Sequence, residues 1–595
     1  MKYFLWGLLF FAVAYLVPIA GRPLTRPDEF RYGEIPREML ESGDFVTPRL
    51  LRARYFEKPV LGYWLVAGSF RIFGESRFSL RLPMALATGL TALLLALWIR
   101  RAARDPEWAL WAALFFLATA LGFSLGTTAV LDSLLCLFTT AALICVHQAV
   151  TTEKWNFERL IWLVLCGVTA GLGFMTKGFV AWAVPGSAAF AYLLLTKRWK
   201  AFLWLPWIPL AVLAVTIAPW AAGIHRAEPD FWHYFVVVEH FQRFKSGADT
   251  QHPEPFWFYV PVMLGTLFPA LISVLHGAAA DREVWKKAWQ NDLWRFALCA
   301  VVLPFCFFSA SKGKLPPYIL PCFPFAAAVL TFPALEALRS GRRVTQRTFS
   351  LIFDIFGWLL LVLGAAEIAF GLALLPPVSL WRHIPVLTGA APLFLLFGAA
   401  SAAGGAWLIR RRNSWRLRFH EFARLRLAGF FGFFALAFAA LAAMPDFGSD
   451  KMPERDLSAL AGSGEFDPRT AMLFTYGQMG HSVAWVFRRS DTRLLFAPGE
   501  MEYGADGARR DGSPLLWTHG DNGEFARLVR DPKRRVAVVY IAPADEVKRL
   551  RGKWLLKLKP RCVVRGCMMA MIFDPVTSPS ARSASPAASP APPAR

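Results

Sequence analysis

Charged side chains are scarce in this sequence. Asp, Glu, Lys and Arg together make up 18% of the 595 residues, whereas soluble globular domains carry about 25%. Hydrophobic residues reach 56%, and they include 52 Phe and 24 Trp. This composition is too apolar for an ordinary soluble protein, so it indicates a polytopic membrane protein.

Acidic residues are the scarcer of the two charged classes. The chain has 42 Asp and Glu against 65 Lys and Arg, which gives a formal net charge of +23. A nucleic-acid partner would require a basic stripe on a soluble fold, with interleaved aromatics or a reading helix, and the sequence has none. The basic excess is therefore explained by membrane topology and attraction to anionic lipid, and nucleic acid is not an expected partner.

Several other features are missing. The N-terminus lacks a small-x-small cleavage site, which favours an uncleaved first helix over a signal peptide. No internal repeat is evident, and the last part of the chain has no Gly-rich nucleotide loop. Cysteine is rare: six of the eight fall in apolar stretches as packing residues. Only Cys562 and Cys567 are expected outside, where a disulfide and two free thiols are both open alternatives.

Apolar stretches long enough to cross a bilayer dominate the first three quarters of the chain. A spanning helix needs roughly 20 apolar residues, and windows of this size predict about thirteen spans. The predicted spans are 3–20, 82–100, 107–124, 128–148, 158–175, 178–196, 201–222, 257–277, 294–310, 318–336, 349–373, 385–408 and 428–444.

The basic residues predict the orientation of these spans. With a cytoplasmic N-terminus, alternate connections carry most of the cations, as the positive-inside rule expects. The inside set is Arg100, Arg101, Arg104, Lys154, Arg159, Lys197, Arg198, Lys200, Lys286, Lys287, Arg339, Arg342, Arg343 and the arginines between 410 and 426. The first external loop is an exception, because it carries seven arginines and Lys58. We interpret those cations as ligands of a bound anion.

The composition changes after the last predicted span. Short apolar runs at 471–476, 493–497, 536–542 and 568–573 alternate with helical patterns at 481–489, 524–531 and 546–552. Alternating strands and helices predict a small α/β domain. We therefore expect a transmembrane domain at 1–445, an external α/β domain at 446–576, and a disordered Pro, Ala and Ser tail at 577–595.

The predicted topology brings the chemically interesting residues to one face. The first loop, TRPDEFRYGEIPREMLESGDFVTPRLLRARYFEKPVLGYW, is rich in acids and arginines. Charged residues at a membrane boundary are costly unless they are paired or solvated. Even so, charges from later loops gather on the same outer side: Asp132, Lys177, Glu239, His240, Arg243, Lys312 and Lys314. This asymmetry predicts an active site at the membrane surface.

Four runs of the sequence together resemble one family. RPDEFRYGEIPREML, RYFEKPVLGYW, VEHFQRF and SKGKLPPYILPCF are similar to runs of bacterial undecaprenyl-phosphate aminoarabinose transferases, which are membrane-embedded glycosyltransferases of the GT-C class. The likeness covers residues 1–335, and the predicted spans with an external α/β end also fit. Phe30 and Pro317 depart from the family pattern, at positions that bear on the sugar and the acceptor.

The resemblance implies a role for each matched residue. Asp28 falls on the essential acid of the family, and Glu29 completes the predicted catalytic pair. Lys58 would hold the phosphate of the lipid donor. Glu57 and His240 would bind zinc or another divalent metal, with the phosphate completing a sparse shell.

The loops and the resemblance together also predict a substrate-binding set. It consists of Arg31, Tyr32, Tyr55, Lys58, Asp132, Lys177, Lys314 and Tyr318. Structural alternatives stay open: Asp28 as a helix cap, Asp132 and Lys177 as a structural ion pair, His240 as an interfacial histidine, and Tyr318 as an aromatic-belt residue.

The function that follows is transfer of 4-amino-4-deoxy-L-arabinose, or a related sugar, from undecaprenyl phosphate to lipid A at the periplasmic side of the bacterial inner membrane. Resistance to polymyxins is the expected phenotype, because the aminosugar masks anionic charge. A protein O-mannosyltransferase-like enzyme would share the Asp-Glu loop and is one alternative. A lipid-linked sugar flippase or transporter is the other, although it should show broken helices and midplane charges.

Overall fold

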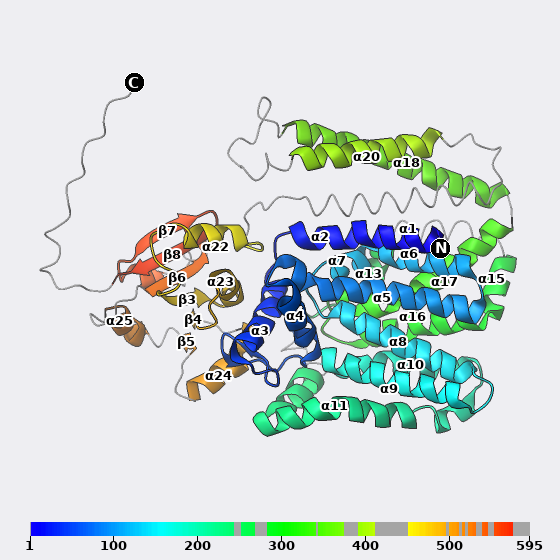
Figure 1. The fold of residues 1–595 in the computed structure, drawn as a ribbon, viewed down its shortest axis with the longest axis horizontal. Helices are drawn as coiled ribbons and strands as arrows, with labels where there is room; N and C mark the ends of the chain where they lie inside the picture. Colours follow the sequence, from blue (N-terminus) through cyan, green and yellow to red (C-terminus); the bar gives the residue numbers. More distant parts are fainter. Residues whose placement is uncertain are drawn as a thin grey trace, which may run out of the picture. The chain divides into compact units, whose positions relative to one another are not determined.

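The computed structural model describes residues 2–242, 252–267, 282–340, 343–373, 391–410, 450–495, 499–510, 515–517, 522–530, 538–545 and 553–574 (Figure 1). The predicted span 428–444, the predicted helix 546–552 and the predicted tail 577–595 lie outside these residues. Contacts divide the chain into two units. One unit is Met1–Pro23, Ile35–Pro48 and Phe56–Asp446, and the other is Leu24–Glu34, Arg49–Tyr55 and Phe447–Arg595. Two segments of the first loop therefore group with the C-terminal part, which the sequence did not predict; the predicted domain boundaries stay a prediction.

The first unit is built from helices. An N-terminal helix of two α segments joined by a π-helical turn is followed by a short helix after the first loop and then by a long series. Their bounds are α1 Lys2–Phe11, η1 Ala12–Leu16, α2 Val17–Gly21, α4 Leu61–Phe73, α5 Arg77–Ala103, α6 Pro106–Ala118, α7 Ala120–Gly126, α8 Asp132–Thr151, α9 Phe157–Lys177, α10 Val180–Leu195, η2 Trp199–Leu203, α11 Trp207–Ala227, η3 His233–Gln242, α13 Tyr259–Leu267, α15 Arg282–Gln290, α16 Asp292–Ala310, η4 Pro316–Cys322, α17 Phe323–Arg339, α18 Arg343–Ala373 and α20 Ala391–Arg410. Every predicted span up to 385–408 overlaps one of these helices.

The lengths of these helices support a multi-pass membrane protein. Among the described residues, six helices are long and apolar enough to cross a membrane, or seven if one bent pair is a single span. Four more apolar helices are shorter than this. The predicted span 107–124 is not one straight helix: it consists of α6 and α7, which are bent by 67° relative to each other. The break occurs because Thr119 leaves the helical conformation and its hydroxyl accepts from the backbone N–H of Gly122 at 3.2 Å.

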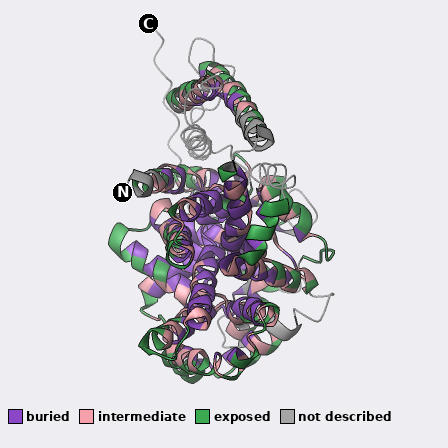
Figure 2. Cartoon of the chain, turned by 90° about the vertical axis from the view of Figure 1, so that its right-hand side faces the viewer, coloured by how far each residue is buried: buried purple, intermediate pink, exposed green. Residues whose placement is uncertain are grey.

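Close packing of buried faces holds the helices together. Figure 2 shows buried residues concentrated where helices face one another and exposed ones on the outward surfaces. Hydrogen bonds to backbone carbonyls add to this packing: Tyr15 donates to Leu117 at 2.7 Å and the indole of Trp108 to Ala328 at 3.1 Å. Five of the six cysteines predicted in spans are buried, but Cys306 is exposed on α16.

The helices α18 and α20 form an antiparallel hairpin (Figure 1). Glycines face each other along it, and a Cβ atom placed on Gly364 would lie 2.6 Å from the backbone N of Ala402 and from the carbonyl O of Gly398. Glycine lets two helix backbones approach closely, which is how membrane helices commonly associate. Within the contact the hydroxyl of Ser401 donates to Glu367 at 3.2 Å.

The second unit contains a six-stranded sheet. Its order is β5-β4-β3-β6-β8-β7, with parallel pairing from β5 to β6 and antiparallel pairing of β8 with its two neighbours. The bounds are α22 Glu454–Ala461, β3 Met472–Tyr476, α23 Met479–Phe487, β4 Arg493–Leu495, η6 Gly499–Met501, α24 Glu502–Arg510, β5 Leu516–Trp517, α25 Asn522–Arg530, β6 Val538–Pro543, α27 Lys553–Leu556, β7 Arg561–Arg565 and β8 Met568–Phe573.

Both faces of this sheet are covered by apolar side chains of helices. Leu457 of α22 and Val483 of α23 pack on one face, and Phe525 of α25 and Leu555 of α27 on the other. The predicted α/β fold is thus confirmed, although the sequence missed β5, β7, α22 and α24. The cysteines of this unit, Cys562 and Cys567, are both free thiols.

The first loop is itself folded. Its first half forms α3, Asp28–Ser42, and its second half forms a short hairpin of β1, Arg49–Leu50, and β2, Ala53–Arg54. The turn of this hairpin requires a left-handed backbone at Leu51 and Arg52, which have φ angles of 52° and 62°.

Candidate active site

The two acids of the predicted catalytic pair lie in different environments. Asp28 and Glu29 occupy the first turn of α3, where the positive end of the helix dipole favours negative charge. Glu29 is fully buried, and its carboxylate accepts from the backbone N–H of Thr25 at 3.0 Å and from its hydroxyl at 2.9 Å. The side chain of Asp28 is 46% exposed. Glu29 therefore stabilises the start of the helix, and Asp28 is the more accessible of the two acids.

Arg31 is the centre of a compact polar cluster within the second unit. Its guanidinium pairs with Asp28 and Glu500, and it donates to the hydroxyl of Tyr55 at 2.9 Å. The rings of Tyr32 and Tyr55 lie 5.0 Å and 5.8 Å from its central carbon, within cation–π distance. The structure thus brings together four predicted site residues, and it adds Glu500.

The electrostatics of this cluster favour a permanently charged arginine. Arg31 is 7% exposed. Burial alone would lower the pKa of its guanidinium, but Tyr55, Glu500, Tyr32 and Asp28 together hold that pKa well above its usual value. A buried, fixed cation next to a half-exposed acid is suited to recognising a substrate that carries both signs of charge.

A buried histidine lies next to Glu500. His481, in α23, is 1% exposed, and its Nε2 is 3.7 Å from Oε1 of Glu500. Neither ring nitrogen has a hydrogen-bond partner among the described residues. Burial lowers the pKa of His481 to about 3, and the positive charges of Arg31 and Arg26 act in the same direction. The imidazole is therefore neutral at physiological pH.

Lys58 forms the centre of a second contact group, which belongs to the first unit. Its Nζ lies 2.5 Å from Oε1 of Glu239 in η3 and donates to the carbonyl O of Glu57 at 2.8 Å. The neighbouring Phe56 packs edge-on against Phe231 at 5.1 Å. Aromatic packing thus holds the lysine segment against η3 and its carboxylate.

The residues predicted to hold a metal ion are only partly described. Glu57 is 8% exposed, and His240 lies in η3 with its side chain outside the described residues. No group of three or more His, Cys, Asp or Glu side chains that could hold a metal ion occurs in the described part of the chain. The described residues alone therefore do not form a metal site.

Asp132, Lys177 and Tyr318 form a third contact group, also within the first unit. Nζ of Lys177 is 2.6 Å from Oδ1 of Asp132 and 4.8 Å from the centre of the Tyr318 ring. Asp132 begins α8 and Lys177 ends α9, so both lie at the same end of this antiparallel helix pair. The ion pair that was one alternative for Asp132 and Lys177 is therefore present, and the ring of Tyr318 lies next to it.

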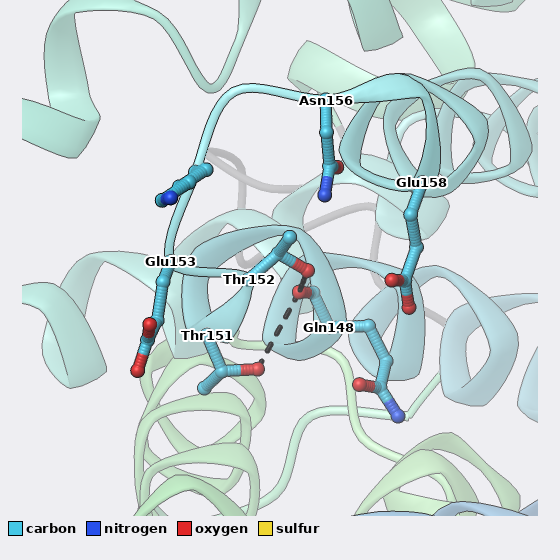
Figure 3. Close-up of a pocket in the computed structure, with 7 residues that line it drawn as sticks. Gln148, Thr151, Thr152, Glu153, Asn156 and Glu158 are labelled. Atoms are coloured by element: carbon cyan, nitrogen blue, oxygen red, sulfur yellow. Dashed lines mark hydrogen bonds between the residues drawn. The ribbon is translucent and has the colours of Figure 1, made fainter.

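The opposite end of the same helix pair carries a different surface. Figure 3 shows the turn between α8 and α9, where polar side chains including Gln148 and Glu158 line an open hollow of about 400 Å³. Arg101 pairs with Glu158 there. Arg101 and Lys154, two of the basic residues predicted to face inside, thus lie at the end with this hollow and not at the end with Asp132 and Lys177.

Lys314 differs from the other predicted substrate ligands. It is 3% exposed, and its ammonium donates to the backbone carbonyls of Glu254, at 2.8 Å, and Ser311. These bonds tie the segment before α13 to the turn after α16, where Pro253 and Gly313 form an isolated β-bridge. The observed contacts of Lys314 are therefore structural.

Sequence reasoning missed the contributions of Glu500 and His481 and gave Glu239 no role. Glu500 lies 469 residues after Arg31 in a turn without a recognisable pattern. Glu239 had a usable signal, because it directly precedes His240 in the run VEHFQRF.

Comparisons with known proteins show which proteins this chain is similar to. The family described as dolichyl-phosphate-mannose-protein mannosyltransferase matches residues 1–235. An undecaprenyl phosphate-alpha-4-amino-4-deoxy-L-arabinose arabinosyl transferase of Erwinia tasmaniensis is 36% identical over 510 residues, which cover 85% of this chain and 88% of the relative. A protein of the same description from Enterobacter sp. (strain 638) is 34% identical over 571 residues, covering 93% and 98%.

The fold is also similar to a solved structure. The crystal structure of ArnT from Cupriavidus metallidurans bound to undecaprenyl phosphate superposes with a TM-score of 0.75 at 21% identity, covering 96% of this chain and 98% of that one. This likeness confirms the predicted fold class, a polytopic helical membrane protein of the GT-C type with a C-terminal α/β part.

Proposed function

Because this chain belongs to the family of undecaprenyl phosphate-α-4-amino-4-deoxy-L-arabinose arabinosyl transferases, we propose that it transfers 4-amino-4-deoxy-L-arabinose from undecaprenyl phosphate to a phosphate of lipid A. The observation that carries this proposal is identity above one third with the Erwinia tasmaniensis transferase over most of both chains. Lys58 in the first unit and Arg31 in the second are each held by contacts within their own unit, and such a reaction needs fixed cations.

The reaction is a displacement at the anomeric carbon of the sugar. An oxygen of the lipid A phosphate attacks this carbon, and the bond to the oxygen of undecaprenyl phosphate breaks with inversion. Negative charge builds up on the departing phosphate. Fixed cations in a partly dry site stabilise such charge without reorganising, and Lys58 is assigned this role.

Asp28 is assigned to substrate positioning. A lipid A phosphate is already ionised near neutral pH, so it needs no general base, unlike a hydroxyl acceptor. The half-exposed carboxylate of Asp28 is instead placed to bind the ammonium of the aminosugar or to orient the acceptor. Near wild-type activity of an Asp28→Ala variant would remove every role proposed for this residue.

The protein is a multi-pass membrane protein, and we propose that it lies in the bacterial inner membrane with its site on the periplasmic side. Support comes from the helix pair α8 and α9. Asp132 and Lys177 lie at one end, and Arg101 pairs with Glu158 at the other end, near Arg100 and Arg104. The basic residues at the second end support a cytoplasmic position for it, as the positive-inside rule expects.

A protein O-mannosyltransferase activity is the second candidate, because the mannosyltransferase family matches residues 1–235. A labelled polyprenyl-phosphate sugar, offered to the purified protein with lipid A or with protein, separates the two. Label in lipid A is expected. Label in protein alone would replace the proposal with the second candidate, and no transfer to either would favour a flippase.

Two further expectations depend on this function. Mass spectrometry of lipid A from cells with and without the gene should show the added aminosugar only with the gene, together with higher resistance to polymyxin. A zinc ion held by Glu57 and His240 stays a prediction, and elemental analysis of the purified protein with a Glu57→Gln variant as the control tests it.

A further inference from the structure

Lys58, the lysine assigned to the donor phosphate, already has an anionic partner inside the protein. Oε1 of Glu239 lies 2.5 Å from Nζ of Lys58. The side chain of Glu239 is 8% exposed and that of Lys58 is 17% exposed. The residues are 181 positions apart, so this contact is a product of the tertiary fold and not of helix periodicity.

The position of Glu239 is fixed by its surroundings. Phe56, two residues before Lys58, packs against Phe231 at 5.1 Å and Tyr234 at 6.4 Å, and both of these rings come from the segment that leads into Glu239. Lys58 also donates to the carbonyl O of Glu57. Two of its three N–H donors are therefore used, and one of them holds a carboxylate in a largely dry site.

A carboxylate beside Lys58 opposes the binding of a second anion. Two like charges held a few ångströms apart in a partly dry site repel each other more strongly than they would in water. This repulsion differs between donor and product. The donor is a phosphodiester with one negative charge, whereas undecaprenyl phosphate is a monoester that carries about −1.5 to −2 at pH 7.

We propose that Glu239 takes the place on Lys58 that the donor phosphate occupies during the reaction, and that it drives release of the more highly charged undecaprenyl phosphate afterwards. This inference rests on the proposed function. Between turnovers, the carboxylate of Glu239 holds the side chain of Lys58 in place and neutralises the charge of its ammonium. It then competes with the lipid phosphate for the ammonium and penalises the product more than the donor.

The test measures lipid binding to the full-length protein in nanodiscs. Undecaprenyl phosphate is the probe, and the neutral alcohol undecaprenol is the reference. A Glu239→Gln variant is expected to bind undecaprenyl phosphate about tenfold more tightly than wild type, with unchanged binding of undecaprenol. Product inhibition by undecaprenyl phosphate should strengthen by a similar factor, and kcat should fall more than KM for the donor.

Two controls assign the effect to Lys58. Asp230→Asn removes the same charge from an exposed side chain just before η3, so it should leave binding unchanged. In a Lys58→Gln background, Glu239→Gln should no longer tighten binding. A purely structural role of Glu239 would instead predict a lower melting temperature and weaker binding in Glu239→Gln.

The outcomes separate this inference from the proposed function. Equal or weaker binding by Glu239→Gln, with wild type still binding undecaprenyl phosphate, overturns the inference and leaves the transferase proposal intact. Tighter binding that persists without Lys58, or that Asp230→Asn reproduces, also overturns it. Failure of wild type to distinguish undecaprenyl phosphate from undecaprenol counts against the transferase itself.

Discussion

Replacing the buried histidine of the second unit should change how its stability depends on pH. His481 is 1% exposed, and burial lowers the pKa of its imidazole to about 3 from a usual value of 6.5. The folded state therefore binds this proton less readily than the unfolded state. The stability associated with the neutral ring is fully present above pH 6.5 and is lost as the pH falls toward 3.

The magnitude follows from the width of this window. Between pH 8 and pH 5 only the unfolded state takes up the proton, over about 1.5 pH units below 6.5, and each unit corresponds to about 1.4 kcal/mol. When the pH falls from 8 to 5, the free energy of unfolding of the second unit should therefore decrease by about 2 kcal/mol through His481 alone. This is about a 30-fold change in the folding equilibrium.

Hydrogen exchange in the full-length protein measures this loss locally. Peptides from β3 and α23, corrected for intrinsic exchange rates, should show about 30-fold lower protection at pH 5 than at pH 8. In a His481→Leu variant this part of the pH dependence should vanish, since Leu cannot titrate. At pH 8 the free energy of unfolding of the His481→Leu variant should be close to that of wild type. No hydrogen bond is lost, because neither ring nitrogen of His481 has a hydrogen-bond partner among the described residues. An identical pH dependence in wild type and variant would refute the reasoning.

Two further substitutions test other parts of the structure. Arg31→Lys should lower transfer activity about 10-fold to 100-fold. A single ammonium cannot pair with Asp28 and Glu500 and also reach Tyr55, as the planar guanidinium does. Activity above one half of wild type in the labelled-sugar assay would contradict this. Gly364→Ala should destabilise the hairpin of α18 and α20 by about 1–3 kcal/mol, because its Cβ atom would lie 2.6 Å from backbone atoms. Gly404→Ala, where nothing lies within 4 Å, is the matched control, and equal melting temperatures of the two variants would count against close packing.

Much of the fold was predictable because apolar runs are a local signal. The spans from 3–20 to 385–408 all overlap helices, and the runs at 471–476 and 568–573 form strands. The bend between α6 and α7 was missed, because the sequence around Thr119 stays apolar on both sides of the break. The strand β7 was missed because it is a short edge strand in which only Val563 is buried and both end residues are exposed arginines.

The sequence predicted several residues of the candidate site, but it did not predict which of them are in contact. Arg31, Tyr32 and Tyr55 were predicted to act together, and the structure places them around one guanidinium. Lys314 was predicted as a substrate ligand, yet its ammonium is used by backbone carbonyls. A lysine in a polar turn looks the same in sequence whether it faces a substrate or its own main chain.

The sequence by itself determined that this protein is a helical membrane protein with an α/β C-terminal part, and it predicted Asp28, the cations and the tyrosines of the candidate site. Hydropathy and residue type are properties of short segments, so they can be recognised without a fold. Only the tertiary structure decided that Glu29 is a buried brace, that Glu500 reaches Arg31, and that Glu239 holds Lys58. Glu500 and Glu239 meet their partners across 469 and 181 residues, and chain folding alone sets which charges meet over such separations.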